Sequence, residues 1–338
     1  MRKNLKTIKA GFSFVVFVML LLLAFNYRMC IYLCHQAYGQ FRILRNAVPC
    51  SAFEGSTALS RQEKENLHLL PELKKFSVGE LGFIPTHNFE KIYNQSGDPV
   101  LWVLTASEPY SLEAYEWVFP LIGEVSYKGF FKKEMAEAEE TRLKYLGYDT
   151  DVRPVTAWST LGWFDDPLLS NMLAYSKSAF CNLIFHELFH ATFYKKSRVD
   201  ENENLANFVA VKATELFLKK DTQEMSGFRN KLKSEKAFHQ FMKRQCDGLS
   251  KFYKSIQKEK HRKYLKEKYF SRIGDSLKLL SIINESQLKR ISNLVRRSGN
   301  AYFIDFRQYE YLQDSLENVF NKNYRRDLKK MIAHLKAN

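Results

Sequence analysis

Residues 180–190 of the chain are FCNLIFHELFH, an apolar segment that contains the pattern His-Glu-x-x-His at positions 186 to 190. Its hydrophobic residues predict a buried helix. Residues i and i+4 of a helix lie on the same face, so the imidazoles of His186 and His190 can bind one Zn²⁺ ion. Glu187 follows His186 and can take a proton from a water that the metal activates. The segment therefore predicts a hydrolytic zinc site.

A structural interpretation of the same residues must be weighed. His186 and His190 could be core histidines, and Glu187 could be a paired carboxylate. Burying His186, Glu187 and His190 within this apolar segment would be costly without a purpose, however. We therefore favour the metal site.

A third ligand is expected from residues 200–209, DENENLANFV, which begin a second predicted helix. Twelve residues separate His190 from Glu203, and Glu201 is the rival ligand. Ala206 and Ala210 leave room for a close helix approach on the side of Glu203, which favours Glu203. Asp200 or Asn202 could cap the helix. The expected apolar stripe of this helix consists of Leu205, Phe208, Val209, Leu216 and Phe217.

The remaining pattern predicts an α+β fold that is mostly helical. The 338 residues are 45% hydrophobic, which excludes a disordered or collagen-like chain, and the five cysteines form no CxxC pair of the kind found in cysteine zinc sites. Short apolar runs broken by Gly and Pro predict a strand-rich lobe over about 76–165, with strands at 100–104 and 152–163 and a helix at 134–146. Catalytic helices should occupy about 171–220, and a basic helical part about 221–338.

The N-terminus has the pattern of an export signal. Four basic residues precede an apolar run at residues 10–25. No small-x-small cleavage site and no convincing lipobox follow, so we expect a retained membrane anchor within residues 1–28, with a cleaved signal as the alternative. The basic flank places the N-terminus in the cytoplasm. The rest of the chain should then face the far side of the membrane.

Positive charge is concentrated in one region. The chain carries a net charge of +15, and residues 219–272 contain 17 Lys plus Arg against 6 Asp plus Glu, a net charge of +11. Apolar residues recur there at helical spacing, which predicts one or two long amphipathic helices. Their cationic face could attract an anionic lipid or envelope polymer, or could simply be solvated. A protein exported across the membrane does not meet nucleic acid there, so we do not expect this cationic face to bind nucleic acid.

Several blocks of the chain match the pattern of one family. They are residues 34–40, 117–123, 127–131, 157–170, 186–190 and 202–209, together with Asn300, Ala301 and Tyr309. On these blocks the chain resembles the bacterial predicted zinc aminopeptidase family, envelope-associated relatives of the gluzincin metallopeptidases with a zincin-like fold. Trp158 stands where the family usually has tyrosine, and Glu124 where a cysteine is common.

The resemblance implies a set of site residues. It assigns His186, His190 and Glu203 as ligands of one Zn²⁺ per chain and Glu187 as the general base, and it removes Glu201 as the rival ligand. The aminopeptidase activity and a peptide substrate are also implied by the resemblance.

Two further roles can be nominated. Tyr309, Tyr127 or Tyr175 could donate a hydrogen bond to the oxyanion of the tetrahedral intermediate, and Tyr309 is our preferred candidate. Asp165, Asp166 or Glu124 could bind the substrate ammonium, although Asp-Asp-Pro at residues 165–167 is also a good turn sequence.

The sequence therefore predicts an anchored zinc peptidase in which Glu187 activates the attacking water. The resemblance implies that this peptidase is an aminopeptidase, anchored in the inner membrane of a bacterial cell and facing the periplasm or the exterior. The alternative is a non-catalytic envelope-binding protein whose zinc site is structural or lost.

Overall fold

The structure is a computed structural model that describes residues 27–55, 59–119, 123–155, 165–195, 198–280, 282, 284–308 and 313–337. The chain divides into two units, Met1–Asn46 and Ala47–Asn338. The expected membrane anchor at residues 10–25 lies outside the described residues. Among the helices that are described, none combines the length and apolar character needed to cross a membrane.

In the first unit, the described residues form one helix, α2 (Tyr27–Asn46). Its sequence contains no acidic residue, and Arg45 lies in its last turn, where a cation interacts favourably with the helix dipole. The helix exposes a stripe of large apolar side chains at i, i+4, i+11 and i+14, namely Tyr27, Ile31, Tyr38 and Phe41.

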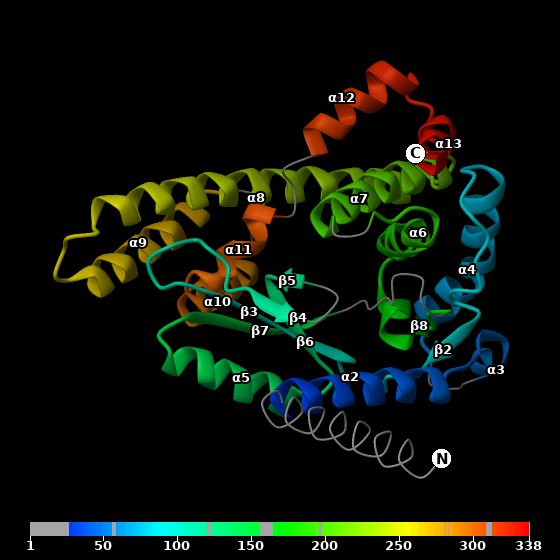
Figure 1. The fold of residues 1–338 in the computed structure, drawn as a ribbon. Coiled ribbons are helices and arrows are strands. Elements are labelled where there is room, and N and C mark those ends of the chain that lie inside the picture. Colours follow the sequence, from blue (N-terminus) through cyan, green and yellow to red (C-terminus); the bar gives the residue numbers. More distant parts are fainter. Residues whose placement is uncertain are drawn as a thin grey trace, which may run out of the picture. The chain divides into compact units, whose positions relative to one another are not determined.

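The second unit is a mostly helical α+β structure with three small sheets (Figure 1), so the expected fold class is confirmed at that level. In the first sheet, β2 (Lys91–Tyr93) lies between β1 (Val48–Pro49), which is antiparallel to it, and β8 (Leu168–Leu169), which is parallel. Ile92, Leu168 and Leu169 are fully buried. Strand β8 runs directly into the 3₁₀ helix η1 (Ser170–Ala174), so this sheet fixes the start of the helical part.

The second sheet has β3 (Leu101–Ser107) at its centre, antiparallel to β6 (Tyr127–Phe130) and β7 (Asp149–Val155). The third is a hairpin of β4 (Trp117–Phe119) and β5 (Gly123–Val125). The strand expected at 100–104 is thus confirmed. The strand expected at 152–163 begins earlier, at Asp149, and residues 156–164 lie outside the described part of the chain.

Three helices accompany the strands. They are α3 (Cys50–Glu54), α4 (Arg61–Gly79) and α5 (Lys133–Tyr145), the last of which confirms the helix expected at 134–146. Helix α4 begins with a capping box, in which the Glu63 backbone amide donates to Ser60 Oγ and the Ser60 amide donates to the Glu63 carboxylate. It packs against α6 (Lys177–Thr192) through Phe76 and Phe185, whose ring centroids are 5.9 Å apart.

From residue 177 onward the described chain is helical. After α6 come α7 (Val199–Phe217), α8 (Thr222–Ser255), α9 (Arg262–Leu277), α10 (Glu285–Ser298), α11 (Ala301–Gln308), α12 (Gln313–Tyr324) and α13 (Leu328–Ala337). Helices α8 and α9 are the long amphipathic helices that the basic region predicts. Their apolar stripe, including Phe241, Met242 and Leu249, lies in a hydrophobic cluster with residues of α10 and α11.

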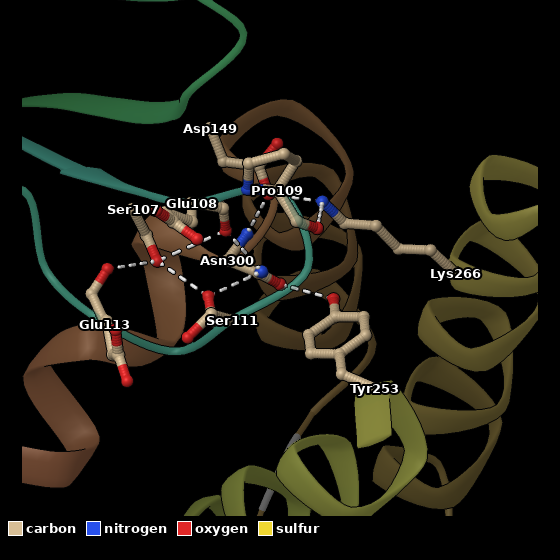
Figure 2. Close-up of polar contacts among 9 residues, drawn as sticks. All are labelled: Ser107, Glu108, Pro109, Ser111, Glu113, Asp149, Tyr253, Lys266 and Asn300. Atoms are coloured by element: carbon tan, nitrogen blue, oxygen red, sulfur yellow. Dashed lines mark hydrogen bonds and ion pairs between the residues drawn. The ribbon is translucent and has the colours of Figure 1, made fainter. Parts of the chain in front are cut away.

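A polar network ties the second sheet to these C-terminal helices (Figure 2). Asn300, fully buried before α11, donates from Nδ2 to the carbonyls of Glu108 and Ser111 and accepts from the Tyr253 hydroxyl at 2.6 Å. Its backbone amide donates to Asp149, which also pairs with Lys266. Because all these groups are satisfied, the network can be buried, and it gives Asn300 a structural role.

Candidate metal centre

Helix α6 presents the His-Glu-x-x-His pattern from inside the core. Phe180, Ile184, Phe185 and Phe189 are fully buried around it. The aromatic side chains pack the helix against its neighbours. The ring centroids of Phe185 and Phe217 of α7 are 5.9 Å apart, and those of Phe189 and Phe83 are 5.7 Å apart. The backbone that carries the two histidines is therefore held by close packing.

The second helix, α7, packs along α6 and brings a carboxylate to the histidines. Ala206 and Ala210 are fully buried, as expected for small residues at a close helix contact. Glu203 Oε2 lies 3.3 Å from His186 Nε2, and Glu203 Oε1 lies 3.4 Å from His190 Nε2. The two Nε2 atoms are 3.0 Å apart. All three side chains thus offer ligand atoms to one point in space.

Two of these three spacings match a tetrahedral zinc ion. Zn–N and Zn–O bonds of about 2.0–2.2 Å place neighbouring ligand atoms of a tetrahedron about 3.3–3.6 Å apart. The separations of Glu203 from the two histidines fall in this range, and the 3.0 Å between the two Nε2 atoms is slightly shorter. Two imidazole nitrogens and one carboxylate are also a donor set that zinc accepts, and three protein ligands leave the fourth position open, as in catalytic sites. The His186–His190–Glu203 triad is therefore a candidate metal site.

The electrostatics of the triad follow from its burial. Burial alone would raise the pKa of Glu203, but hydrogen bonds and charge from His186 and His190 hold this pKa at about 2. Burial alone would lower the pKa of His186, yet Glu203, Glu187 and a hydrogen bond to Asn207 raise it. The carboxylate therefore stays ionised, which a metal ligand requires.

Glu187 is buried beside the triad, with 8% of its surface exposed. Burial raises the pKa of its carboxyl group, the charges of His186 and His190 oppose the rise, and those of Glu203 and Asp166 add to it. The charge of Asp166 thus reaches Glu187 in the folded protein.

The rival interpretations of residues 200–202 are wrong. Glu201 is exposed and pairs with Arg198, so it does not join the triad. Helix α7 begins at Val199, so Asn202 lies inside it and does not cap it. Instead, the buried Asn202 side chain donates to the Lys195 carbonyl at 2.8 Å and accepts from the Lys195 amide at 2.9 Å. These two bonds fix the connection between α6 and α7.

The other nominated residues are scattered. Asp165 is exposed and contributes to the electrostatic surroundings of Lys74, whereas Asp166 is buried and its backbone bonds to Asn88 and Phe89. Glu124 is exposed on β5, Tyr127 is 40% exposed on β6, and Tyr175 follows η1. Tyr309 and Trp158 lie outside the described residues.

Sequence reasoning missed Tyr194. Its ring meets the ring of His190 edge-on at 6.5 Å, and burial together with the charge of Glu203 raises the pKa of its phenol. Tyr194 follows His190 at the same four-residue spacing that separates His190 from His186. This spacing could have indicated Tyr194 as a site residue.

One of the comparisons with known proteins found a family that matches this chain. The family model described as "Putative aminopeptidase" matches residues 31–337, nearly the whole chain, including the triad and Glu187. No curated protein and no solved structure matches. Because the match covers far more than half of the sequence, the chain belongs to the putative aminopeptidase family.

Proposed function

We propose that the chain is a zinc-dependent peptidase with a zincin-like catalytic domain, acting as an aminopeptidase on peptide substrates. The observation that carries the proposal is the convergence of His186, His190 and Glu203, whose ligand atoms lie within 4.8 Å of one another. Glu187 lies on α6 with the two histidines. Membership of the aminopeptidase family supports the choice of a peptide bond as the target.

In this proposal, His186, His190 and Glu203 hold one Zn²⁺ per chain. When bound, zinc supplies a Lewis acid that polarises the scissile carbonyl and lowers the pKa of a water molecule. Asn207 supports the site by hydrogen-bonding His186, because an outer partner fixes the orientation of a ligating imidazole.

Glu187 carries the proton in the reaction. Its carboxylate accepts a proton from the attacking water as the new C–O bond forms, and it returns that proton to the leaving nitrogen as the C–N bond breaks. Its buried position limits exchange of this proton with bulk solvent. The products are a free carboxylate and a free amine.

An aminopeptidase must also bind the substrate ammonium and stabilise an oxyanion. We assign the first role to Asp166, because it is buried in the electrostatic reach of Glu187. For the second role, Tyr309 is the assignment made from the sequence, and Tyr194 is the candidate favoured by its place beside His190 and Glu203. Single Tyr→Phe variants distinguish them, since loss of an oxyanion donor lowers kcat about 100-fold or more.

We also propose that residues 1–28 anchor the protein in the inner membrane of a bacterial cell, with the peptidase in the cell envelope. The basic flank and the apolar run at residues 10–25 support this. Carbonate extraction of membranes tests the anchor, and protease accessibility in spheroplasts tests the orientation. Release of the full-length chain by carbonate would rule out the anchor.

Activity of a Glu187→Gln variant tests the proposed reaction. Wild type should cleave an aminoacyl p-nitroanilide, and Glu187→Gln should lose at least about 1,000-fold in kcat while keeping one zinc per chain. Glu201→Gln is the matched control, because Glu201 lies on the neighbouring helix and pairs with Arg198 at the surface.

An N-acetylated form of the same substrate tests the exopeptidase assignment. A free ammonium should be required, and Asp166→Asn should abolish the preference for it. Equal cleavage of both substrates would indicate an endopeptidase. No cleavage by zinc-loaded wild type of either substrate or of a peptide library would contradict the peptidase proposal as a whole.

A further inference from the structure

Apart from the candidate metal site, the structure contains a cavity where the end of α7, the beginning of α8 and α12 meet. Its volume is about 650 Å³, within the range of about 300–1,000 Å³ typical of small-molecule sites. Helix α8 lines it along one continuous face, with residues 222, 225, 226, 229, 230 and 233 at helical spacing. None of the metal ligands contributes to this cavity.

The charge of this cavity is strongly unbalanced. Its lining includes five cationic residues, namely Lys212, Lys219, Arg229, Lys233 and Arg326. Glu215 is the single carboxylate among the lining residues. Such an imbalance around a hollow favours an anion.

Part of the positive charge is already neutralised. Lys212 pairs with Glu317 at 2.7 Å, and Arg229 pairs with Glu215 at 3.5 Å. Within the described part of the chain, Lys219, Lys233 and Arg326 have no carboxylate oxygen within 4.0 Å. These three cations therefore remain available to a ligand from outside.

The cavity also contains apolar surface. Met225 and Phe320 are buried, with 8% and 4% of their surfaces exposed. Leu216 was expected in the buried stripe of α7, but it is 46% exposed and lines the cavity. An apolar side chain that faces a cavity beside a cationic rim gains free energy when hydrocarbon covers it.

We propose that this cavity binds one anionic amphiphile, whose phosphate or carboxylate headgroup pairs with Lys219, Lys233 and Arg326. Its hydrocarbon part lies over Leu216 and Phe320. The hydroxyl groups of Thr222 and Ser226 on α8 add hydrogen-bond donors for the headgroup. The apolar surface favours an amphiphile over a purely polar anionic polymer, which would leave Leu216 uncovered.

Binding of a short-chain lipid tests this proposal in the full chain, held in phosphatidylcholine nanodiscs. Dihexanoyl phosphatidic acid is titrated below its critical micelle concentration by calorimetry, with empty nanodiscs as the blank. Inorganic phosphate probes the headgroup alone, and dihexanoyl phosphatidylcholine probes the chains with a neutral headgroup. Wild type should bind the phosphatidic acid at least about tenfold more tightly than either probe.

Two charge-matched variants locate the site. Lys219→Gln/Lys233→Gln should weaken binding about tenfold, because two headgroup ion pairs are lost. Lys220→Gln/Lys231→Gln makes the same change in net charge on neighbouring residues that do not line the cavity, and it should alter binding by less than about twofold. Leu216→Ser should weaken binding about threefold or more through the hydrocarbon contact.

A variant at Arg326 provides a second test of the headgroup site in case Lys219→Gln/Lys233→Gln does not fold. Arg326 has φ of 64°, a backbone conformation that Asn tolerates, so Arg326→Asn removes the charge without forcing the turn to change. Circular dichroism melting confirms that each variant is folded. The variant should again bind phosphatidic acid more weakly than wild type does.

Three results would overturn the proposal. Equal effects of the cavity and control pairs would mean that only net charge matters. Equal affinity for phosphate and phosphatidic acid would mean a simple anion site. Binding to anionic vesicles without binding of the monomeric lipid would mean a membrane-surface contact instead of a ligand in the cavity.

Discussion

Glu203 on α7 places one carboxylate oxygen 3.3 Å from Nε2 of His186 and the other 3.4 Å from Nε2 of His190, both on α6. This contact joins two helices that are connected by a short segment, residues 193–198. The geometry of the candidate metal site thus depends on how closely the two helices pack. Any change that separates α6 from α7 should lower the affinity of the site for a metal ion.

Removal of the carboxylate ligand should abolish metal binding. Glu203→Ala should reduce zinc from about one per chain to near zero by elemental analysis, because two histidines alone make a weak site. Wild type should lose several degrees of Tm on treatment with a chelator, since a ligand that binds only the folded state stabilises it. The Tm of Glu203→Ala should not respond to the chelator.

Glu201→Ala is the matched control for this experiment, because Glu201 lies two residues away on the same helix and pairs with Arg198 at the surface. It should keep its zinc and its response to the chelator. Loss of zinc in Glu201→Ala with retention in Glu203→Ala would show that the ligand assignment is wrong.

Asn202→Ala should destabilise the protein and weaken zinc binding together. The buried Asn202 side chain makes two hydrogen bonds to the Lys195 backbone, and its loss leaves both groups unsatisfied. We expect a fall of about 2 kcal/mol in the free energy of unfolding, measured by urea denaturation of the metal-free protein. Asn321→Ala, which removes an exposed amide, should change it by less than about 0.5 kcal/mol. Similar values for the two variants would contradict the role given to Asn202.

Tyr253→Phe tests the network around Asn300. The hydroxyl of Tyr253 donates to Asn300 Oδ1 at 2.6 Å in a fully buried setting. Its removal should cost about 1–2 kcal/mol of stability, because the Asn300 oxygen loses that bond. Tyr145→Phe is the control, since Tyr145 is 91% exposed and should tolerate the change without loss. An unchanged unfolding midpoint in Tyr253→Phe would show that the network does not stabilise the fold.

Glu139 should make the free energy of unfolding depend on pH in the acid range. Burial by itself would raise its pKa, but bonds from Arg142 and Trp117 and the charge of Lys128 lower this pKa from 4.5 to about 2. Since the folded-state pKa lies below the unfolded one, the stabilisation is complete above about pH 4.5 and is lost as the pH falls toward 2.

The measurement is the difference in unfolding free energy between wild type and Glu139→Gln. We expect about 1–2 kcal/mol at pH 7, after allowance for solvent screening, and a smaller difference at pH 3. Glu137→Gln on the same helix removes only a half-exposed pair with Lys133 and should show little pH dependence. A difference for Glu139→Gln that does not shrink on acidification would contradict the assignment.

Much of the helical part could be predicted from the sequence because its signals are local. The apolar residues around His186 predicted the buried helix α6, and the spacing of Phe241, Met242 and Leu249 predicted the long helix α8. Helical periodicity repeats within a few residues, so one stretch of chain carries the whole signal. The pairing of β2 with β8 was not predicted, because it joins residues 92 and 168, which no local pattern connects.

The individual roles of neighbouring polar residues were harder to predict. Spacing favoured Glu203 over Glu201 only weakly, and Asn202 was one of two candidates for a helix cap. Helix α7 begins at Val199, so Asn202 lies inside it, and the packing of α7 on α6 places Glu203 beside both histidines. Leu216 shows the same limit, since its place in an apolar stripe predicted burial and the helix end leaves it exposed.

By itself, the sequence determined the chemistry available to this protein: two histidines on one helical face, a carboxylate between them and acidic residues on a following helix. Covalent order and the 3.6-residue repeat suffice for that. Only the tertiary structure showed that both oxygens of Glu203 lie beside the two histidines, that the charge of Asp166 reaches Glu187, and that cationic and apolar side chains line one cavity. Those relationships arise from packing between elements distant in sequence, and packing depends on the whole core at once.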